Sequence, residues 1–489
     1  MSWLNNVTPE SMGLPSAAVE GMLDDLQSLC MHSFMVMRRN QVLAEGYWKP
    51  FSAQRKHRMY SVSKTFVSAS IGHLVDKGLL SLDDKVVKFF PDKLPENPSP
   101  YLMDMTIRDL LMMATPHTRP TYARDRKDWV DSFFITEPDH PAGTVWAYDT
   151  SGSFILDVIV ERVTGKTFLE SMREDILDPI GFSKDAWCIN SPDGYSWGGS
   201  GVECTTRDLA RFATVFANHG QWEGRQLLSR QYVDEATSNL IDNNYTGHED
   251  DTDGSFGYGY QVWQIRNGAY AFLGMGAQLA LILPKEELVF VCTGDTQGNP
   301  NGYRQIFNAL WDNIVVHLHD AALPEDAAAQ KKLADRLAGL GVAPQKGSAA
   351  SPWVEKISGK TFTMTANPMG ITKMRLDFEG DTLTWSYTNP RGDKQIKLGL
   401  GHIEEGVFPE EHYFGPTIGT PAGRGYRCLS SAGWTRENQL VLRIWLTDDY
   451  YGNLAVNLGF KGDEVGVLMC KTAEWFLDEY QGFAGGKMA

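Results

Sequence analysis

The chain has 489 residues, of which 42% are hydrophobic and 22% charged, and its net charge at pH 7 is −16. A globular chain of this length exceeds one typical core, so two domains are expected. The negative charge argues against nucleic acid or an anionic membrane surface as partner. No apolar run is long enough to cross a bilayer, and the first residues lack the basic and apolar regions of a signal peptide, which predicts a cytoplasmic protein.

The six cysteines are far apart, with no Cys-x-x-Cys pair. Buried free thiols are therefore expected, rather than disulfides or a zinc site. The acidic loop at residues 248–253 could hold a cation, but it lacks the twelve-residue spacing of a calcium hand, so a solvated loop is the preferred interpretation. No metal and no organic cofactor is predicted, and the pattern indicates no particular oligomeric state.

The first predicted elements are a hairpin and a long helix. Two short apolar runs within residues 34–43, on either side of Arg39-Asn40, predict the β-hairpin. Residues 61–77 then keep apolar side chains at helical spacing, and Gly78 can end that helix. The apolar positions are Phe66, Val67, Ile71, Leu74 and Val75.

Ser61 and Lys64 stand at the start of this predicted helix. Residues three apart share a helical face, so the Ser61 hydroxyl and the Lys64 amine can meet, and a neighbouring base turns a serine into a nucleophile. A lysine pushed toward a core must pair or lose its proton, and a neutral lysine is a base. The unpaired amides of a first helical turn can also bind a developing oxyanion. The alternative is an ordinary helix start with a capping serine.

The middle of the chain is predicted to be mostly helical, and strands follow it. Helices are expected at 106–113, 151–164 and 205–218, the last capped by Thr205 or Thr206. Beyond Tyr258, strands are expected at 262–265, 278–283 and 288–293, followed by a helix at 302–318. Strands at both ends with helices between them suggest one sheet built from both termini of the domain and covered by helices.

The C-terminal third has a different character. A charged, alanine-rich helix at 325–340 leads into a Gly, Ala, Ser and Pro-rich linker at 341–352. Period-two alternation beyond it predicts a β-rich barrel or meander, interpreted as a packing or lid module. The alternating segments are 375–378, 383–387, 440–446 and 455–460. The expected domains are 1–322 (the sheet and its helices), 323–352 (helix and linker) and 353–489 (β-rich accessory).

Two further stretches carry candidate site residues. Tyr148 precedes the helix predicted from Ser151. The ordinary pKa of tyrosine, near 10, matches that of lysine, near 10.4, so such a pair can pass a proton, although a packing tyrosine is the alternative. In Phe272-Leu273-Gly274-Met275-Gly276-Ala277-Gln278, glycines at a strand entrance allow close approach, and an amide there could complete an oxyanion hole. A bulge or sheet bend is the alternative.

Together these stretches resemble the penicillin-recognising serine hydrolases over about residues 8–320. The resemblance is greatest to the class C β-lactamase-related branch, which includes esterases, D-amino-acid peptidases and 6-aminohexanoate-dimer hydrolases. It implies a β-lactamase/transpeptidase-like α/β (α+β) fold, with an antiparallel sheet covered by helices. The segments that carry it are Tyr60 to Phe66, Gly78 to Asp84, Thr106 to Leu111, Trp146 to Tyr148, Gly198 to Gly201, Thr206 to Ala210 and Gly274 to Gln278.

The resemblance also implies roles for single residues. Ser61 would be the acylated nucleophile, Lys64 its activating base and Tyr148 the proton shuttle to the leaving group. The backbone amides of Ser61 and Met275 would form the oxyanion hole. Supporting or substrate-binding positions would be Thr150, Phe272, Gly274 and Gln278. Candidate pocket walls are Trp146, Trp197 and Trp263, although ordinary core packing is the preferred interpretation of each.

Two positions depart from the family pattern. Thr150 stands where an asparagine is frequent, and Phe272 stands where the third motif usually begins with lysine or histidine. Phe272 can supply neither charge nor a hydrogen bond to a substrate carboxylate. A neutral small ester or short amide is therefore the expected substrate, rather than a β-lactam or a C-terminal carboxylate peptide.

Three alternatives stay open beside a small-ester or amide hydrolase with an acyl-enzyme on Ser61. One is a D-amino-acid peptidase or β-lactamase-like amidase, and another is a non-catalytic binding protein of the same fold. The third uses Ser196 in Gly194-Tyr195-Ser196-Trp197-Gly198, which matches the Gly-x-Ser-x-Gly elbow of α/β-hydrolases. That elbow requires a strand before the serine and a helix after it, and the surrounding residues predict neither.

Overall fold

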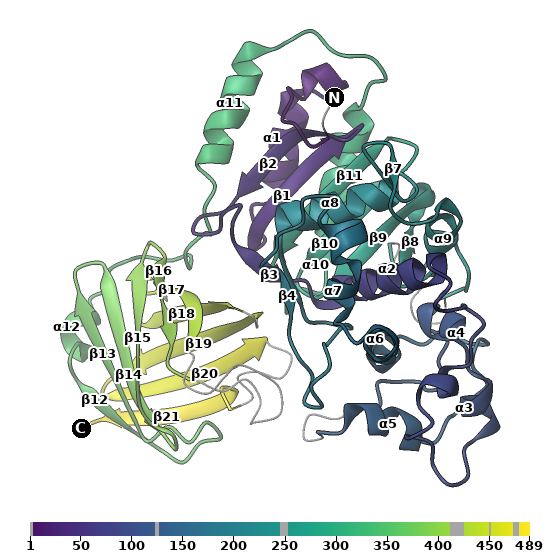
Figure 1. Cartoon of the computed structure of the whole chain (residues 1–489). Coiled ribbons are helices and arrows are strands. Elements are labelled where there is room, and N and C mark those ends of the chain that lie inside the picture. The colour runs from purple at the N-terminus through teal and green to yellow at the C-terminus, as the bar shows by residue number, and fades with distance from the viewer. Residues whose placement is uncertain (1–2, 123–126, 245–252, 411–424, 449–450, 473–478) are drawn as a thin grey trace. The chain divides into compact units, whose positions relative to one another are not determined.

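The computed structural model describes residues 3–122, 127–244, 253–410, 425–448, 451–472 and 479–489 (Figure 1). The chain divides into two compact units, Met1–Gly341 and Val342–Ala489. Within the described ranges, the helices fall short of the length and apolar character needed to cross a bilayer.

A six-stranded antiparallel sheet organises the first unit. The strand order is β2-β1-β11-β10-β9-β8, so the N-terminal hairpin pairs with the last strand of the unit. This pairing confirms the predicted sheet built from both termini of the domain. The strands are β1 (Met31–Arg38), β2 (Gln41–Tyr47), β8 (Trp263–Ile265), β9 (Ala269–Gly274), β10 (Gln278–Leu283) and β11 (Leu288–Gly294). Every residue of β1, β10 and β11 is buried, because helices cover both faces.

One face of the sheet carries the terminal helices of the unit. Helix α1 (Ser16–Leu26) packs against α10 (Gly302–Ala309) and α11 (Ala327–Ala338), and α11 also contacts β2. The helix predicted at 302–318 is not a single α-helix: a π-helical turn at Leu310–Ile314 and a 3-10 turn at Val315–His317 follow α10.

The larger helical layer covers the opposite face. Helix α8 packs on β1, β10 and β11, and stacking of Phe66 on Phe212 at 3.9 Å joins α2 to α8. The predicted hairpin and the helices expected at 106–113, 151–164 and 205–218 are confirmed, and Thr106 and Thr205 each make a capping box. The helix expected at 61–77 is present but begins at Ser63, after a 3-10 turn at Tyr60–Val62. The helices here are α2 (Ser63–Asp76), α3 (Pro100–Asp104), α4 (Ile107–Leu111), α5 (Trp129–Ile135), α6 (Thr150–Thr164), α7 (Phe168–Met172), α8 (Thr206–Ala217) and α9 (Arg230–Ala236).

Two small sheets complete the first unit. One has the order β3-β5-β4, formed by β3 (Lys56–Arg58), β4 (Trp187–Cys188) and β5 (Val202–Thr205). The other pairs β6 (Gln221–Trp222) with β7 (Arg225–Gln226). The first places the chain just before Ser61 beside the chain just after Gly201, because β3 and β5 are antiparallel neighbours.

The second unit is a closed β-barrel (Figure 1). Its ten described strands follow the order β15-β14-β13-β12-β21-β20-β19-β18-β17-β16, and parallel pairing of β15 with β17 closes a ring of nine, with β16 beside β17. The buried faces of β18 and β19 alternate with less buried positions, as expected for strands around a core. The strands are β12 (Thr361–Met364), β13 (Lys373–Glu379), β14 (Thr382–Asn389), β15 (Gly392–Leu400), β16 (Glu404–Phe408), β17 (Tyr426–Arg436), β18 (Gln439–Thr447), β19 (Tyr451–Lys461), β20 (Glu464–Thr472) and β21 (Gly482–Met488), and α12 (Val354–Ile357) precedes them.

The segment interpreted as a linker, residues 341–352, packs against the barrel instead. Ser348 and Trp434 exchange backbone hydrogen bonds of 2.9 Å in both directions, and the Gln345 amide donates to Ser431 Oγ at 2.6 Å. Residues 342–352 therefore belong to the second unit. Small-residue composition alone does not distinguish a tether from an extended segment that pairs with a strand.

Candidate active site

Ser61 lies on a tight turn rather than on the first turn of the α-helix. Tyr60–Val62 form a 3-10 turn, and α2 begins at Ser63. Tyr60 has φ of 45°, a left-handed conformation that is unfavourable for a residue with a side chain. The turn is tied to its surroundings, since the Val202 amide donates to Ser63 Oγ at 3.0 Å.

Lys64 is buried directly beneath Ser61, with 1% of its surface exposed. Its Nζ donates to Ser61 Oγ at 2.9 Å and to the Gly199 carbonyl at 2.6 Å. The same nitrogen lies 5.0 Å from the centroid of the Tyr148 ring. The structure thus brings together the hydroxyl, the amine and the phenol named from the sequence.

Tyr148 reaches the site from the loop that precedes α6. Burial raises the pKa of the phenol to about 12, and the Ser61 side chain acts on this pKa in the opposite direction. The neutral phenol is therefore the form present at neutral pH. Trp146 and Trp263 flank the ring, with centroids 6.2 and 5.5 Å from it, and Tyr258 packs against both tryptophans.

Asp149 anchors the helix that follows Tyr148. It is the N-cap of α6, and its carboxylate accepts from the Ser151 amide at 2.8 Å and from Thr115 Oγ1 at 2.9 Å. The side chain is fully buried, and desolvation raises its pKa to about 6 in spite of these hydrogen bonds. Asp149 thus fixes the start of α6, one residue after the catalytic candidate Tyr148.

We expect Asp149→Asn to make the protein more stable relative to wild type at pH 8 than at pH 4.5. The folded pKa, about 6, is above the usual 3.8, so the contribution of Asp149 is fully present below pH 3.8 and is lost as the pH rises through 6. Two pKa units correspond to about 3 kcal/mol, and asparagine retains the cap. Urea unfolding of both proteins at the two pH values measures the difference. If the difference in unfolding free energy between the two proteins did not change with pH, the raised pKa of the buried Asp149 carboxylate would be contradicted.

The turn between β9 and β10 approaches the Ser61 turn closely. A Cβ on Gly274 would lie 2.2 Å from the Met59 carbonyl oxygen and 3.1 Å from the Val62 amide nitrogen. Only glycine permits this approach, because both neighbours are backbone atoms. Gly276 and Ala277 follow with φ of 79° and 78°, so the turn makes a sharp reversal just after Met275.

Gln278 supports the turn from inside. Its Nε2 donates to the Met275 carbonyl at 3.0 Å and to the Gly294 carbonyl at 2.8 Å, and the side chain is fully buried. The Tyr303 hydroxyl donates to the Gly274 carbonyl. Gln278 is therefore a supporting residue of the Met275 turn and not a substrate contact, and Tyr303 is a second support that the sequence pattern did not indicate.

The two amides named for an oxyanion hole lie on these adjoining turns. Across the described ranges, the backbone hydrogen bonds of turns and loops include none donated by the Ser61 or Met275 amide. Amides that have no carbonyl acceptor and lie beside a nucleophile are suited to bind a developing oxyanion.

One of the sequence-based assignments needs correction. Phe272 has no exposed surface and packs against Phe216 and Phe212 of α8, at 5.1 and 6.0 Å between ring centroids, so it is a core residue and does not line the site. Trp197 is also core, because its ring packs on Trp129 at 5.3 Å and lies under the Arg58 guanidinium. Alternation along a strand placed Phe272 on the α8 side of the sheet.

Neither Thr150 nor Ser196 lies in the surroundings expected of a catalytic group. Thr150 is the first residue of α6 and lies against Gly199, whose added Cβ would be 2.6 Å from Thr150 Cγ2. Ser196 Oγ donates to Glu161 Oε1 at 2.6 Å, and neither a strand ends nor a helix begins beside it. The elbow interpretation therefore has no structural support.

The sequence reasoning missed the Gly199 carbonyl, which supplies the second acceptor of Lys64. The segment had been noted only for its resemblance to the family. A backbone acceptor carries no residue-type signal, so composition could not have identified it. Glycine at this position is explained by the crowding against Thr150.

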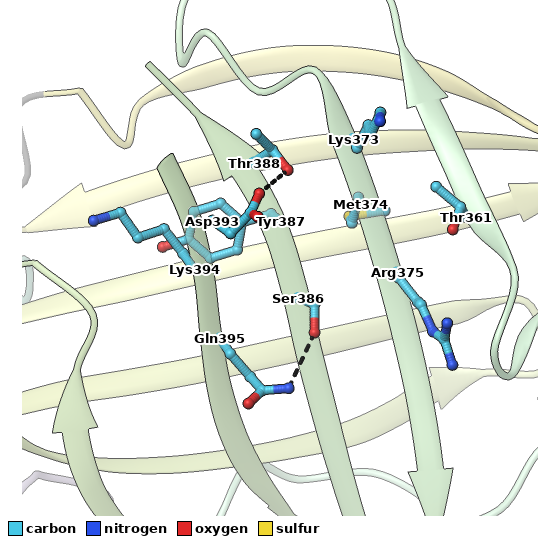
Figure 2. Close-up of a pocket in the computed structure, with 10 residues that line it drawn as sticks. All are labelled: Thr361, Lys373, Met374, Arg375, Ser386, Tyr387, Thr388, Asp393, Lys394 and Gln395. Atoms are coloured by element: carbon cyan, nitrogen blue, oxygen red, sulfur yellow. Dashed lines mark hydrogen bonds between the residues drawn. The ribbon is translucent and has the colours of Figure 1, made fainter. Parts of the chain in front are cut away.

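A cavity of about 430 Å³ lies elsewhere, on the barrel of the second unit (Figure 2). Two pairs of its lining side chains are hydrogen-bonded to each other: Thr388 donates to Asp393 at 2.7 Å and Gln395 donates to Ser386 at 3.4 Å. None of the predicted site residues lines it. Nor do three His, Cys, Asp or Glu side chains converge on a metal position anywhere in the described ranges. Residues 248–252 of the acidic loop lie outside those ranges.

Comparisons with known proteins agree with this fold. Residues 16–310 match the family model described as Beta-lactamase. The 6-aminohexanoate-dimer hydrolase of Paenarthrobacter ureafaciens is 28% identical over 225 residues, 43% of this chain and 57% of that protein, so the match spans little more than half of the relative. A solved Bacillus anthracis protein described as a candidate 6-aminohexanoate-dimer hydrolase superposes with a TM-score of 0.52 at 20% identity, over 66% of this chain and 89% of its own.

The antiparallel sheet, the helical layer and the serine–lysine turn are features of a class of serine hydrolases. Because the matching model covers more than half of the chain, the chain belongs to the beta-lactamase family of these hydrolases.

Proposed function

We propose that this protein hydrolyses a small neutral ester or short amide through an acyl-enzyme on Ser61. The observation that carries the proposal is the position of Lys64 Nζ, which lies 2.9 Å from Ser61 Oγ and 5.0 Å from the centroid of the Tyr148 ring. The nucleophile thus has a base on one side and a proton donor on the other.

The proposed acylation begins when Ser61 Oγ attacks the substrate carbonyl and Lys64 accepts its proton. The oxyanion of the tetrahedral intermediate binds the amides of Ser61 and Met275. Tyr148 then donates its proton to the leaving alcohol or amine and regains one from Lys64. Water attacks the ester formed on Ser61 and releases the acid, which restores the starting state.

The raised pKa of Tyr148 supports the proposed direction of proton transfer. A phenol with a pKa of about 12 is a poor source of tyrosinate at neutral pH, so Lys64 rather than Tyr148 is proposed as the base in acylation. The protonated phenol is the donor that a leaving group requires.

The lining of the site favours a neutral substrate. No lysine or histidine stands at the start of the third motif, and Phe272 is buried in the core. Trp146 and Trp263 beside Tyr148 are half-buried and offer an apolar wall to the group bonded to the scissile carbonyl. A carboxylate on the substrate would lose hydration there without gaining a cation from this motif.

A panel of p-nitrophenyl acetate and butyrate, D- and L-aminoacyl amides and nitrocefin tests the substrate class. We expect turnover of the short esters and little or none of nitrocefin. A fluorophosphonate probe followed by peptide mass spectrometry should label Ser61. A chain that neither reacts with the probe nor turns over any substrate of the panel would instead be a non-catalytic binding protein.

Lys64→Ala and Tyr148→Phe are each expected to lower kcat by about a hundredfold or more on a p-nitrophenyl ester. The first change removes the base and the second removes the donor, while both leave Ser61 in place. Tyr148→Phe should lower the turnover of an ester with a poor leaving group more than that of the p-nitrophenyl ester, because p-nitrophenolate leaves without a proton. Steady-state kinetics with ethyl and p-nitrophenyl esters of one acid measure this difference. Near-normal turnover by Lys64→Ala would rule out its role as base.

A second candidate activity is hydrolysis of a linear amide. The relative from Paenarthrobacter ureafaciens is named for a 6-aminohexanoate dimer, which contains such a bond, and it is 28% identical over the matched residues. The short aminoacyl amides in the panel distinguish this activity from simple esterase activity.

A further inference from the structure

Residues 196–201, called here the 196–201 segment, form a compact turn directly below Lys64. The amides of Ser200 and Gly201 both donate to the Trp197 carbonyl, at 2.9 and 2.7 Å. Between them and Trp197 lies Gly199, whose carbonyl accepts from Lys64 Nζ at 2.6 Å. The position of this one carbonyl therefore depends on how the whole turn is held.

Helix α6 contacts one side of the 196–201 segment through Glu161 and Asp157. Glu161 Oε1 accepts from the Ser196 amide at 3.0 Å and from Ser196 Oγ at 2.6 Å. Asp157, four residues before Glu161, is fully buried against Gly198. A Cβ added to Gly198 would lie 2.8 Å from Asp157 Cβ. The helix and the segment thus meet without space between them.

Strand β3 holds the other side. The Arg58 guanidinium is fully buried, and it donates to the Ser200 carbonyl and to Ser200 Oγ, each at 3.0 Å. Its carbon Cζ lies 4.6 Å from the Trp197 ring centroid. Side chains from two elements far apart in the sequence, Arg58 of β3 and the Asp157 and Glu161 pair of α6, therefore converge on six residues that include no catalytic side chain.

We propose that Glu161 and Ser196 are positioning residues, which hold the Gly199 carbonyl where it orients Lys64 toward Ser61. The inference rests on the proposed function of Ser61 and Lys64. Two hydrogen bonds to one carboxylate oxygen fix the entry of the turn, and small displacements of a catalytic base have large kinetic effects. The serine of the Gly-x-Ser-x-Gly pattern is thus a structural support of the site and not its nucleophile.

The test compares acylation rates of Ser196→Ala, Glu161→Ala and Glu161→Gln with a fluorophosphonate and with a p-nitrophenyl ester. We expect Ser196→Ala to lower kcat about tenfold and Glu161→Ala about thirtyfold, with KM changed less than about twofold. Glu161→Gln should recover to within about threefold of wild type, because its amide oxygen can accept both hydrogen bonds. Thr214→Val, which removes another buried hydroxyl that donates to the Ala210 carbonyl in α8, is the matched control and should keep the wild-type rate.

Wild-type kcat in Ser196→Ala, or an equal loss in Thr214→Val, would overturn the proposal. Should Glu161→Ala fail to fold, the Ser196→Ala and Glu161→Gln pair still decides the outcome. The two proposals are tested separately. If Ser61→Ala is inactive while Ser196→Ala keeps the wild-type kcat, only the positioning role is contradicted. If Ser61→Ala stays active, the proposed function itself is wrong.

Discussion

Ser61→Ala is expected to abolish fluorophosphonate labelling and to lower kcat/KM on a p-nitrophenyl ester by roughly a thousandfold or more. Alanine removes the oxygen that forms the acyl-enzyme but keeps the backbone amide of the oxyanion hole. The hydrogen bond from Lys64 to this side chain is also lost, so Lys64 and Tyr148 have no nucleophile to activate. Stopped-flow measurement of the acylation burst, with thermal unfolding to show that the variant is folded, gives the result.

Ser196→Ala is the control for this experiment, since Ser196 is the other serine in a hydrolase-like sequence pattern. It is expected to be labelled at Ser61 and to keep about a tenth of the wild-type kcat. Loss of all turnover in Ser196→Ala with full activity in Ser61→Ala would reverse the assignment of the nucleophile.

The helices and strands of the first unit could be predicted because their apolar periodicities and caps are local signals. Thr106 and Thr205 illustrate this, since each stands three residues before an aspartate and each forms a capping box. The pairing of the N-terminal hairpin with β11 depends on contacts about 250 residues apart along the sequence, and it was predicted only from the order of strands and helices. The linker was misassigned, because the pairing of Ser348 with Trp434 leaves no mark on local composition.

The residues of the candidate site likewise fall into those that local sequence signals predict and those that depend on long-range contacts. Ser61 and Lys64 are three residues apart, so their meeting could be predicted from helical spacing, and the position of Tyr148 was inferred from resemblance. Phe272 was assigned to the pocket because a motif position does not reveal which face of a strand a side chain occupies. The supports supplied by Tyr303, Glu161 and Gly199 come from long-range contacts and a backbone oxygen, neither of which a single sequence encodes as a pattern.

Gly274→Ala is expected to lower the acylation rate by about a hundredfold while leaving the fold intact. The new methyl group would lie 2.2 Å from the Met59 carbonyl oxygen, a contact that backbone must relieve by moving. Because Met275 follows immediately, the displacement would move its amide away from Ser61 and break the pair of oxyanion donors. The Gly274 carbonyl is also tied to Tyr303, so the strand end cannot simply tilt aside.

Gly339→Ala is a suitable comparison, since its Cβ would meet no atom closer than 3.5 Å and its φ is −89°. Acylation at the wild-type rate in Gly274→Ala, with a normal melting temperature, would show that the Met275 amide takes no part in the reaction. A slow variant with unchanged KM for a small ester would locate the loss in the transition state, because the amide binds an oxygen that carries full charge only there. The close approach of two backbone turns, permitted by one absent side chain, is then what makes the Ser61 hydroxyl useful as a nucleophile.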